Sequence, residues 1–262
     1  MEPPHPDPAL ALARTALAAA PAGLLTDLDG TLAPIVPEPA DARALPGAAD
    51  ALAALSAAGV LVGVISGRAA PDARRILGRD DILVIGNHGL EWLEAGADPT
   101  AVPADAALDR ALAAVPREPG VSVEHKGLSA TVHFRAAPDP ASAAARTREA
   151  LETAAVPGIV LRPGRMSLEV RPAGAGDKGS AVVEVALRHA LRGLVVIGDD
   201  VTDLDMFRAA HRLRDEDGVR VAVLAVGGAG EVPPEVAAAA DATLPGPPAV
   251  LDLLRSLADE AS

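Results

Sequence analysis

Short runs of apolar residues alternate with longer amphipathic stretches in the first and last thirds of the chain. Runs rich in Val, Ile and Leu that end in Gly or polar residues predict parallel strands buried on both faces. The amphipathic stretches predict the connecting helices. Strands are expected at about 23–26, 60–65, 82–85, 194–197, 219–224 and 242–244, and helices at about 8–20, 47–58, 71–78, 177–191 and 248–258. This pattern predicts an α/β fold with a Rossmann-like parallel-sheet core.

The pattern changes in the middle of the chain. Apolar and polar positions alternate there with a period of two, which is typical of antiparallel strands with one buried face. The expected elements are strands at 121–126 and 129–135, a helix at about 140–155, and a hairpin from 159–162 to 165–171 that turns at Pro163 and Gly164. Such a segment between parallel units predicts a separate α+β domain. We expect a core domain of residues 1–103 and 172–262 and a smaller inserted cap domain of residues 104–171.

The alternation divides the side chains of the expected cap strands between two faces. One face carries the apolar positions and should pack on the cap helix. The other face offers Glu124, Lys126, Glu169 and Arg171. This polar face is either the solvated side of a two-layer domain or a lid that grips a hydroxyl-rich substrate.

Composition narrows the possible partners. The net charge of −13 argues against nucleic acid or an anionic membrane as a partner, and the absence of cysteine excludes disulfides and thiolate sites. Three aromatic residues are too few for stacking platforms. No apolar run reaches the ~18 residues of a membrane span, and no signal-peptide pattern is present. We expect a soluble, cytoplasmic monomer that acts on a small molecule.

Two carboxylates follow the first expected strand, in the string Asp27-Leu-Asp29-Gly30-Thr31. Open α/β sheets bind ligands at this end of their strands. Side chains two positions apart in an extended segment point the same way, and Gly30 allows a turn whose amides face an anion. Such a pair suits phosphoryl transfer, in which one carboxylate attacks phosphorus and the other moves a proton. An acidic surface turn is the alternative.

The second expected strand ends in Ser66-Gly67-Arg68. A right-handed crossover would place Ser66 at the same sheet edge as Asp27. Its hydroxyl and the following amides can bind a phosphoryl oxygen, and the same hydroxyl can cap the next helix. The two roles are compatible.

The third expected strand ends in a small polar loop at residues 86–92, which contains Asn87 and His88. Its position at the ligand-facing edge suits substrate contact, and a plain surface turn is an equal alternative. The histidines show no metal-binding spacing. We expect His88, His125 and His133 to pack or form hydrogen bonds.

Lysine is rare in this chain: of 23 basic residues, only Lys126 and Lys178 are lysines. Lys178 lies near the expected N-terminus of a helix, where a cation is unfavourable unless an anion is close. A phosphoryl or aspartyl-phosphate group would supply that anion. A surface lysine is the alternative.

Four acids follow the strand at 194–197 within a few positions: Asp199, Asp200, Asp203 and Asp205. Carboxylates cannot stay close together without a cation or raised pKa values. Oxygen ligands beside waters and phosphate suit Mg²⁺. A solvated acidic helix start is the alternative.

These motifs resemble those of the trehalose-6-phosphate phosphatases, within the haloacid-dehalogenase-like superfamily. The similar strings span residues 22–225 and include Asp-Leu-Asp-Gly-Thr-Leu-Ala-Pro-Ile, Ile-Ser-Gly-Arg, Gly-Asn-His-Gly-Leu-Glu, Val-Glu-His-Lys, Leu-Glu-Val-Arg-Pro and Gly-Asp-Asp-Val-Thr-Asp. The resemblance implies a phosphatase that hydrolyses trehalose 6-phosphate, in trehalose biosynthesis.

The resemblance also implies a role for each matching residue. Asp27 is the nucleophile, Asp29 is the acid and base, and Ser66 and Lys178 hold the phosphoryl group. Mg²⁺ is bound by the Asp27 carboxylate, the Asp29 carbonyl and Asp199, with Asp200 and Asp203 anchoring this set. The candidate substrate-binding residues are Arg68, Asn87 and His88 in the core, and Glu124, Lys126 and Glu169 in the cap.

Two positions depart from the family pattern. Gly164-Arg165 replaces a Gly-Lys pair, which could change a cap contact, and Leu204 replaces a Glu, which removes a carboxylate beside the metal site. Other functions remain open. They are a phosphatase for another sugar phosphate, such as sucrose phosphate or a glycosyl-phosphoglycerate, and a non-catalytic sugar-phosphate sensor or regulatory subunit.

Overall fold

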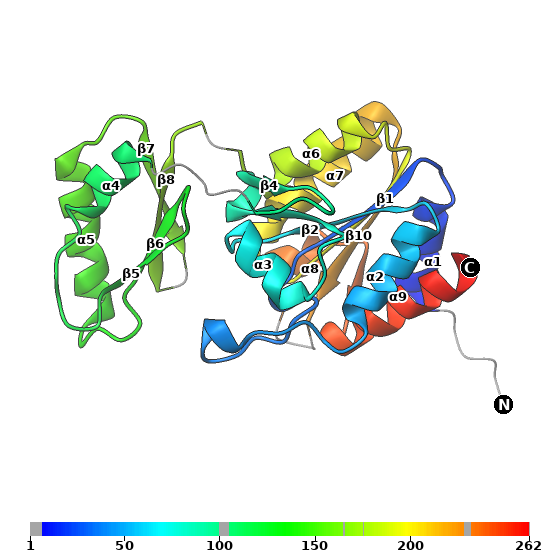
Figure 1. Ribbon diagram of the computed structural model, residues 1–262, viewed down its shortest axis with the longest axis horizontal. Coiled ribbons are helices and arrows are strands. Elements are labelled where there is room, and N and C mark those ends of the chain that lie inside the picture. Colours follow the sequence, from blue (N-terminus) through cyan, green and yellow to red (C-terminus); the bar gives the residue numbers. More distant parts are fainter. Residues whose placement is uncertain (1–6, 100–104, 165, 175, 228–231, 262) are drawn as a thin grey trace. The chain divides into compact units, whose positions relative to one another are not determined.

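The chain forms two compact units in the computed structural model (Figure 1), which describes residues 7–99, 105–164, 166–174, 176–227 and 232–261. The larger unit comprises Met1–Pro99 and Gly176–Ser262, and the smaller comprises Thr100–Ala175. Each division lies four residues from the expected boundary. The use of the smaller unit as a substrate-specificity cap stays a prediction.

A seven-stranded sheet forms the centre of the larger unit, with the strand order β11-β10-β9-β1-β2-β3-β4. All neighbouring strands are parallel except β3 and β4. The strands are β1 (Ala22–Thr26), β2 (Leu61–Ile65), β3 (Leu83–Gly86), β4 (Glu91–Leu93), β9 (Gly193–Gly198), β10 (Arg220–Val226) and β11 (Ala242–Leu244). This architecture confirms the predicted α/β fold with a parallel-sheet core.

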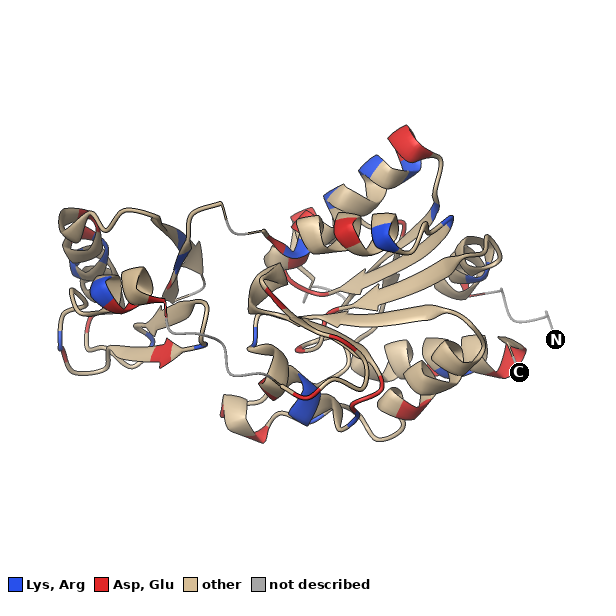
Figure 2. Cartoon of the chain, turned by 45° about the horizontal axis from the view of Figure 1, so that its top comes forward, with Lys and Arg blue, Asp and Glu red and all other residues tan. Residues whose placement is uncertain are grey.

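Helices cover both faces of this sheet. Alternate strand residues pack into two apolar clusters, which is why the strand sequences are apolar throughout. One cluster contains side chains of α1 (Pro8–Leu17), α2 (Ala48–Ala57), α3 (Ala70–Leu77) and α9 (Pro247–Ala261). The other contains those of α6 (Lys178–Arg188), α7 (Leu204–Asp217) and α8 (Pro234–Ala238). In Figure 2 the central strands are tan, and charged residues lie mainly on helices and loops.

The smaller unit is a four-stranded antiparallel sheet with two helices. Its strand order is β5-β6-β8-β7, and α4 and α5 pack on the sheet over a separate apolar cluster. The elements are α4 (Ala106–Leu112), β5 (Ser122–His125), β6 (Ala130–His133), α5 (Pro140–Ala154), β7 (Ile159–Gly164) and β8 (Ser167–Pro172). This confirms the expected smaller α+β unit.

The second hairpin turns later than predicted. Pro163 and Gly164 belong to β7 and face Leu168 and Ser167 of β8, so the prediction of a turn at these two residues is wrong. The physical reason is that β7 is an edge strand, where proline costs no hydrogen bond of the sheet. Arg165 lies outside the described residues.

Arg171 does not lie on an open face of the smaller sheet. Glu124 faces Thr131 of β6, which faces Glu169 of β8, so these two acids share a face as expected. Arg171, two positions after Glu169, is only 1% exposed. The prediction that Arg171 is offered at the surface is therefore wrong.

Several short elements among the described residues were not expected. They are β4, the short helices α4 and α8, and three 3-10 helices at Pro39–Asp41, Asn87–Gly89 and Val201–Asp203. β4 and α8 are too short to give a periodic signal in the sequence. Among the described helices, none is both long enough and apolar enough to cross a membrane.

Candidate active site

Strand β1 places Asp27 at the centre of the larger sheet. β1 lies between β2 and β9, and the Asp27 amide continues the ladder by donating to the Ile197 carbonyl at 2.9 Å. The residue is 5% exposed, so its carboxylate is almost completely shielded from water. A buried carboxylate at the carboxyl ends of parallel strands is the arrangement that the sequence predicts.

Lys178 joins Asp27 to Asp203. Its Nζ lies 2.6 Å from Asp27 Oδ1 and 2.7 Å from Asp203 Oδ1, and all three side chains are buried. Lys178 is the first residue of α6, where its charge opposes the helix dipole. Two carboxylates supply the anionic charge that this position requires. Burial opposes the charged form, but Asp203 and Asp27 outweigh it and raise the lysine pKa.

Asp203 also fixes the loop that follows β9. Its Oδ2 accepts hydrogen bonds from the amides of Asp199 (2.9 Å) and Asp200 (3.1 Å). The Asp203 side chain is fully buried, so these bonds and Lys178 replace its hydration. The loop therefore has a fixed shape, which presents Asp199 next to the turn after β1.

Asp199 packs directly against that turn. Thr31 Oγ1 donates to Asp199 Oδ1 at 3.1 Å. Gly30 has a φ of +86°, and a Cβ atom at this position would overlap the Asp199 carboxylate. Glycine is therefore required at position 30 for two independent reasons, backbone conformation and close approach.

Asp27, Asp199 and Asp203 form a group that can hold a cation. One carboxylate oxygen from each lies within 4.8 Å of the others. Burial, assisted by Asp203 and Asp199 and opposed by Lys178, raises the pKa of Asp27. Burial and Asp203 raise the pKa of Asp199 to about 7. Three carboxylates against one ammonium leave excess negative charge, which suits a hard divalent cation.

The carboxylate of Asp29 is turned toward α3. Arg68 donates from Nε to Asp29 Oδ2 at 2.7 Å and from Nη2 to Asp29 Oδ1 at 2.9 Å. The side chain is therefore separate from the group of three acids, as the prediction of a backbone-carbonyl ligand requires. Metal binding by Asp29 stays a prediction.

Ser66 lies at the end of β2, beside the same sheet edge. It is 1% exposed, and its hydroxyl accepts from the Arg68 amide at 3.2 Å. It is not the cap of α3, because the residue before that helix is Ala69. The Ala70 amide is instead bound by Glu91 Oε2 at 2.7 Å. The helix-capping alternative for Ser66 is therefore wrong.

Asn87 and His88 follow β3 and lie against the Ser66 turn. The Asn87 amide donates to the Arg68 carbonyl at 2.7 Å, and the His88 amide donates to the Ser66 carbonyl at 2.9 Å. Asn87 is buried, and its Nδ2 donates to Glu91 Oε2 at 2.7 Å. A side chain at Gly67 would meet the His88 ring at 2.6 Å. These contacts join the segment that follows β2 to the segment that follows β3.

Sequence reasoning missed three residues that organise this edge: Thr31, Asp72 and Glu91. Thr31 holds Asp199, and Glu91 holds both Asn87 and the first turn of α3. Asp72 accepts from Arg68 Nη1 at 2.8 Å. Thr31 and Glu91 lie inside quoted motifs, which was the available signal. Leu204, the departure from the pattern, packs in an apolar cluster.

The predicted cap residues lie in the smaller unit. His133 Nε2 is 2.9 Å from Glu124 Oε2, and Lys126 Nζ is 4.0 Å from the same oxygen. Glu169 Oε1 lies 3.9 Å from Arg171 Nη1. His125 accepts from the Gly127 amide at 3.1 Å. Hydrogen bonding by His125 and His133 agrees with the prediction, and substrate binding by the other residues stays a prediction.

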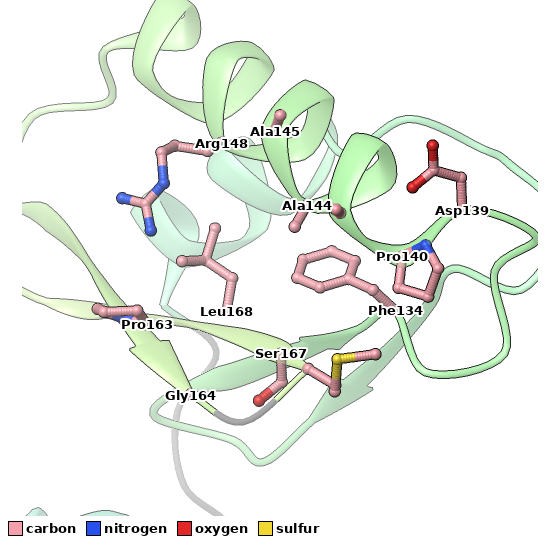
Figure 3. A pocket seen from close by; sticks show the side chains of 12 residues that line it. Phe134, Asp139, Pro140, Ala144, Ala145, Arg148, Pro163, Gly164, Ser167 and Leu168 are labelled. Atoms are coloured by element: carbon pink, nitrogen blue, oxygen red, sulfur yellow. The ribbon is translucent and has the colours of Figure 1, made fainter.

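A separate cavity of about 520 Å³ lies in the smaller unit, between α5 and the β7–β8 hairpin. In Figure 3, Phe134 and Leu168 point from the sheet side toward Ala144 and Ala145 of α5. Arg148 lies at its side. Its lining lacks the acidic group described above, so it is not the candidate active site.

Comparison with known proteins identifies the family of this chain. The family model described as trehalose-phosphatase matches residues 25–239. A trehalose-phosphate phosphatase of Mycobacterium tuberculosis is 37% identical over 218 residues, which cover 76% of this chain and 54% of that protein. A trehalose-phosphate phosphatase of Mycobacterium avium is 35% identical over 207 residues, which cover 71% and 50% of the two chains. This chain thus spans about half the length of these relatives.

A solved structure agrees with these relatives. The C-terminal domain of trehalose-6-phosphate phosphatase from C. albicans is 25% identical, covers 96% of both chains and superposes with a TM-score of 0.74. The matched range includes every core candidate residue, from Asp27 to Asp203. The chain therefore belongs to the trehalose-phosphatase family.

Proposed function

We propose that this protein is a Mg²⁺-dependent phosphatase that hydrolyses trehalose 6-phosphate to trehalose and phosphate. The observation that carries the proposal is the buried group in which Lys178 lies 2.6 Å from Asp27 and 2.7 Å from Asp203, with Asp199 adjacent. In this proposal Asp27 is the nucleophile and Lys178 the fixed cation, and the neighbouring acids at the same sheet edge bind the divalent cation. Trehalose 6-phosphate is proposed as the substrate because the chain belongs to this family and is similar to the two relatives.

The first step transfers the phosphoryl group to Asp27. A carboxylate oxygen of Asp27 attacks phosphorus, the bond from phosphorus to the sugar oxygen breaks, and Asp29 gives that oxygen a proton. Lys178 offsets negative charge on the phosphoryl oxygens. Ser66 and the amides of its turn bind the same oxygens. The products are trehalose and an aspartyl phosphate.

The second step releases phosphate. Asp29, now ionised, removes a proton from a water molecule as the water oxygen attacks phosphorus. The bond to the Asp27 oxygen breaks and the carboxylate is regenerated. A divalent cation held by Asp27, the Asp29 carbonyl and Asp199 would screen the repulsion between the acids and the phosphate. Asp203 and Asp200 shape the loop that presents Asp199.

The smaller unit supplies the sugar contacts in this proposal. Glu124, Lys126 and Glu169 carry charged groups that make strong hydrogen bonds to hydroxyls. Closure of a lid would exclude water and favour the disaccharide. A phosphatase for another sugar phosphate would share the core and differ in these contacts.

Phosphate release with Mg²⁺ tests the function. The substrates are trehalose 6-phosphate, sucrose 6-phosphate, glucose 6-phosphate, mannosyl-3-phosphoglycerate and 4-nitrophenyl phosphate. We expect preference for trehalose 6-phosphate, with turnover abolished by EDTA and by Asp27→Asn. Asp252→Asn, an exposed acid on α9, serves as the matched control.

Each other outcome has a defined meaning. Preference for another sugar phosphate would agree with the proposed mechanism and contradict the proposal that trehalose 6-phosphate is the substrate. Tight binding of trehalose 6-phosphate without turnover of any ester would indicate a sensor.

Glu124→Gln and Glu169→Gln test the cap contacts. Both variants should raise KM for trehalose 6-phosphate and leave hydrolysis of 4-nitrophenyl phosphate unchanged, because that ester lacks the sugar hydroxyls. An equal loss with both substrates would argue against sugar recognition by these residues.

A further inference from the structure

Arg68 binds both oxygens of the Asp29 carboxylate. The Nε–Oδ2 and Nη2–Oδ1 distances are 2.7 Å and 2.9 Å, which is the paired geometry of a guanidinium fork on a carboxylate. The Arg68 side chain is 16% exposed and that of Asp29 is 28% exposed. The pair is thus partly removed from water and fixes the plane of the carboxylate as well as its position.

The guanidinium is itself anchored from two further segments. Arg68 Nη1 donates to the Pro39 carbonyl at 2.9 Å and to Asp72 Oδ2 at 2.8 Å. Asp72 is held in turn by Arg75, whose Nε and Nη2 lie 3.0 Å and 2.6 Å from Asp72 Oδ1. Arg68 therefore connects the turn after β1 to the proline-rich loop and to the first turn of α3.

All three guanidinium nitrogens of Arg68 are already used in these contacts. These contacts occupy four of its five N–H groups, so a substrate oxygen could use only the second N–H of Nη2 without replacing a bond to Asp29, Asp72 or Pro39. These contacts suit an arginine that holds the neighbouring Asp29 side chain better than one that binds a ligand.

We propose that Arg68 is a positioning residue, which sets the Asp29 carboxylate for proton transfer, and not a substrate ligand. This inference rests on the proposed function. In the first step a proton passes from an Asp29 oxygen to the departing sugar oxygen. In the second a proton passes from water to Asp29. Both transfers depend on the placement of one carboxylate, and a misplacement of about 1 Å can cost about 100-fold in rate.

The first experiment compares two substrates that differ in their need for an acid. Trehalose 6-phosphate has an alkoxide leaving group that must be protonated, whereas 4-nitrophenolate leaves without a proton. Arg68→Gln should lower kcat for trehalose 6-phosphate about 100-fold with little change in KM. The burst of 4-nitrophenol from the first turnover should stay close to that of the unaltered protein.

Arg79→Gln is the matched control. Arg79 makes a similar paired contact with a carboxylate, from Nε and Nη2 to the two oxygens of Asp81 at 2.7 Å and 2.6 Å, but its partners Asp81 and Asp50 are exposed acids outside the Arg68 network. Its removal should leave both activities unchanged. Arg68→Lys, a conservative second variant, keeps the charge without the fork and should recover only part of kcat. Melting curves of each variant confirm that it is folded.

The second experiment is a double-mutant cycle on the burst-phase and steady-state rates. If Arg68 acts through Asp29, Arg68→Gln should cause no further loss in the Asp29→Asn background, because residues that act as a unit are not additive. Equal loss in both backgrounds, a rise in KM for trehalose 6-phosphate with unchanged kcat, or an equal slowing of the first turnover with both substrates would overturn the inference. If the unaltered protein hydrolyses none of the esters, the proposed function fails instead.

Discussion

At the scale of single residues, the charge of Lys178 makes the buried acids compatible with one another. Its ammonium lies between Asp27 and Asp203, and these three side chains have almost no contact with water. Removing one partner of a buried ion pair leaves an uncompensated charge, which costs far more than the net worth of the pair. The same lysine therefore has a structural role in addition to its proposed role in catalysis.

Lys178→Met is expected to destabilise the protein by about 3–5 kcal/mol at neutral pH. The loss should be smaller at about pH 5, because burial raises the pKa of Asp27 and this acid then takes up a proton more readily. Urea unfolding at both pH values measures it. Arg148→Met is the control, since that arginine is 43% exposed, lies 3.8 Å from Glu152 and should cost below about 1 kcal/mol. Equal losses for the two variants would contradict the prediction.

The raised pKa of Asp199 predicts a link between pH and cation binding. Its pKa is about 7 in the folded protein against 3.8 ordinarily, with burial as the main cause. An acid with a raised pKa favours the fold at low pH, and this contribution is lost as the pH rises through about 7. The metal-free protein should therefore lose stability from about pH 4 to about pH 7.

A bound cation favours the ionised carboxylate. Mg²⁺ should therefore raise the melting temperature more at about pH 8 than at about pH 5.5. Asp199→Asn should weaken both the Mg²⁺ effect and its pH dependence. The same melting-temperature increase at both pH values in the unaltered protein would contradict this account.

At the scale of elements, the turn after β1 depends on a glycine that no strand or helix signal explains. Gly30 and Gly59 have almost the same φ, +86° and +88°. A Cβ atom at Gly30 would overlap Asp199, whereas nothing lies within 4 Å of a Cβ atom at Gly59. The two positions therefore separate backbone strain from steric overlap.

Gly59→Ala is expected to cost about 1–2 kcal/mol, from the left-handed conformation alone. Gly30→Ala should cost more and should also weaken the stabilisation by Mg²⁺, because Asp199 must move. Urea unfolding with and without Mg²⁺ measures both effects. If the two variants behave alike, the contact between Gly30 and Asp199 has no role in the site.

At the scale of the whole molecule, the two units have separate apolar clusters. Leu168 belongs to the cluster of the smaller unit and Leu24 to one cluster of the larger unit. Because each unit buries its own core, damage to one core should remain within that unit.

Leu168→Ala is expected to destabilise the smaller unit by about 2–5 kcal/mol. Hydrogen exchange should accelerate in β6 and β8 and stay unchanged in β1 and β9. Leu24→Ala should show the opposite distribution. Faster exchange throughout the protein in either variant would mean that the units unfold together.

The residue types and their order in the sequence sufficed to predict the parallel core, the smaller α+β unit and the position of Asp27 after a buried strand. Strand residues buried on both faces must be apolar, and an acid that ends such a run must lie at the sheet edge. The scarcity of lysine drew attention to Lys178 before its partners were known. These inferences rest on the local order of apolar and polar residues, which can be read directly from the sequence.

Tertiary structure alone decided which charges meet. The pairing of Lys178 with Asp203, of Arg68 with Asp29, and of Glu91 with the start of α3 joins segments distant in sequence. The burial of Arg171 and the late turn after Gly164 likewise depend on neighbouring strands. Hydrogen-bond partners are selected by three-dimensional proximity and by the cost of leaving a buried group unpaired, and neither is a property of local sequence.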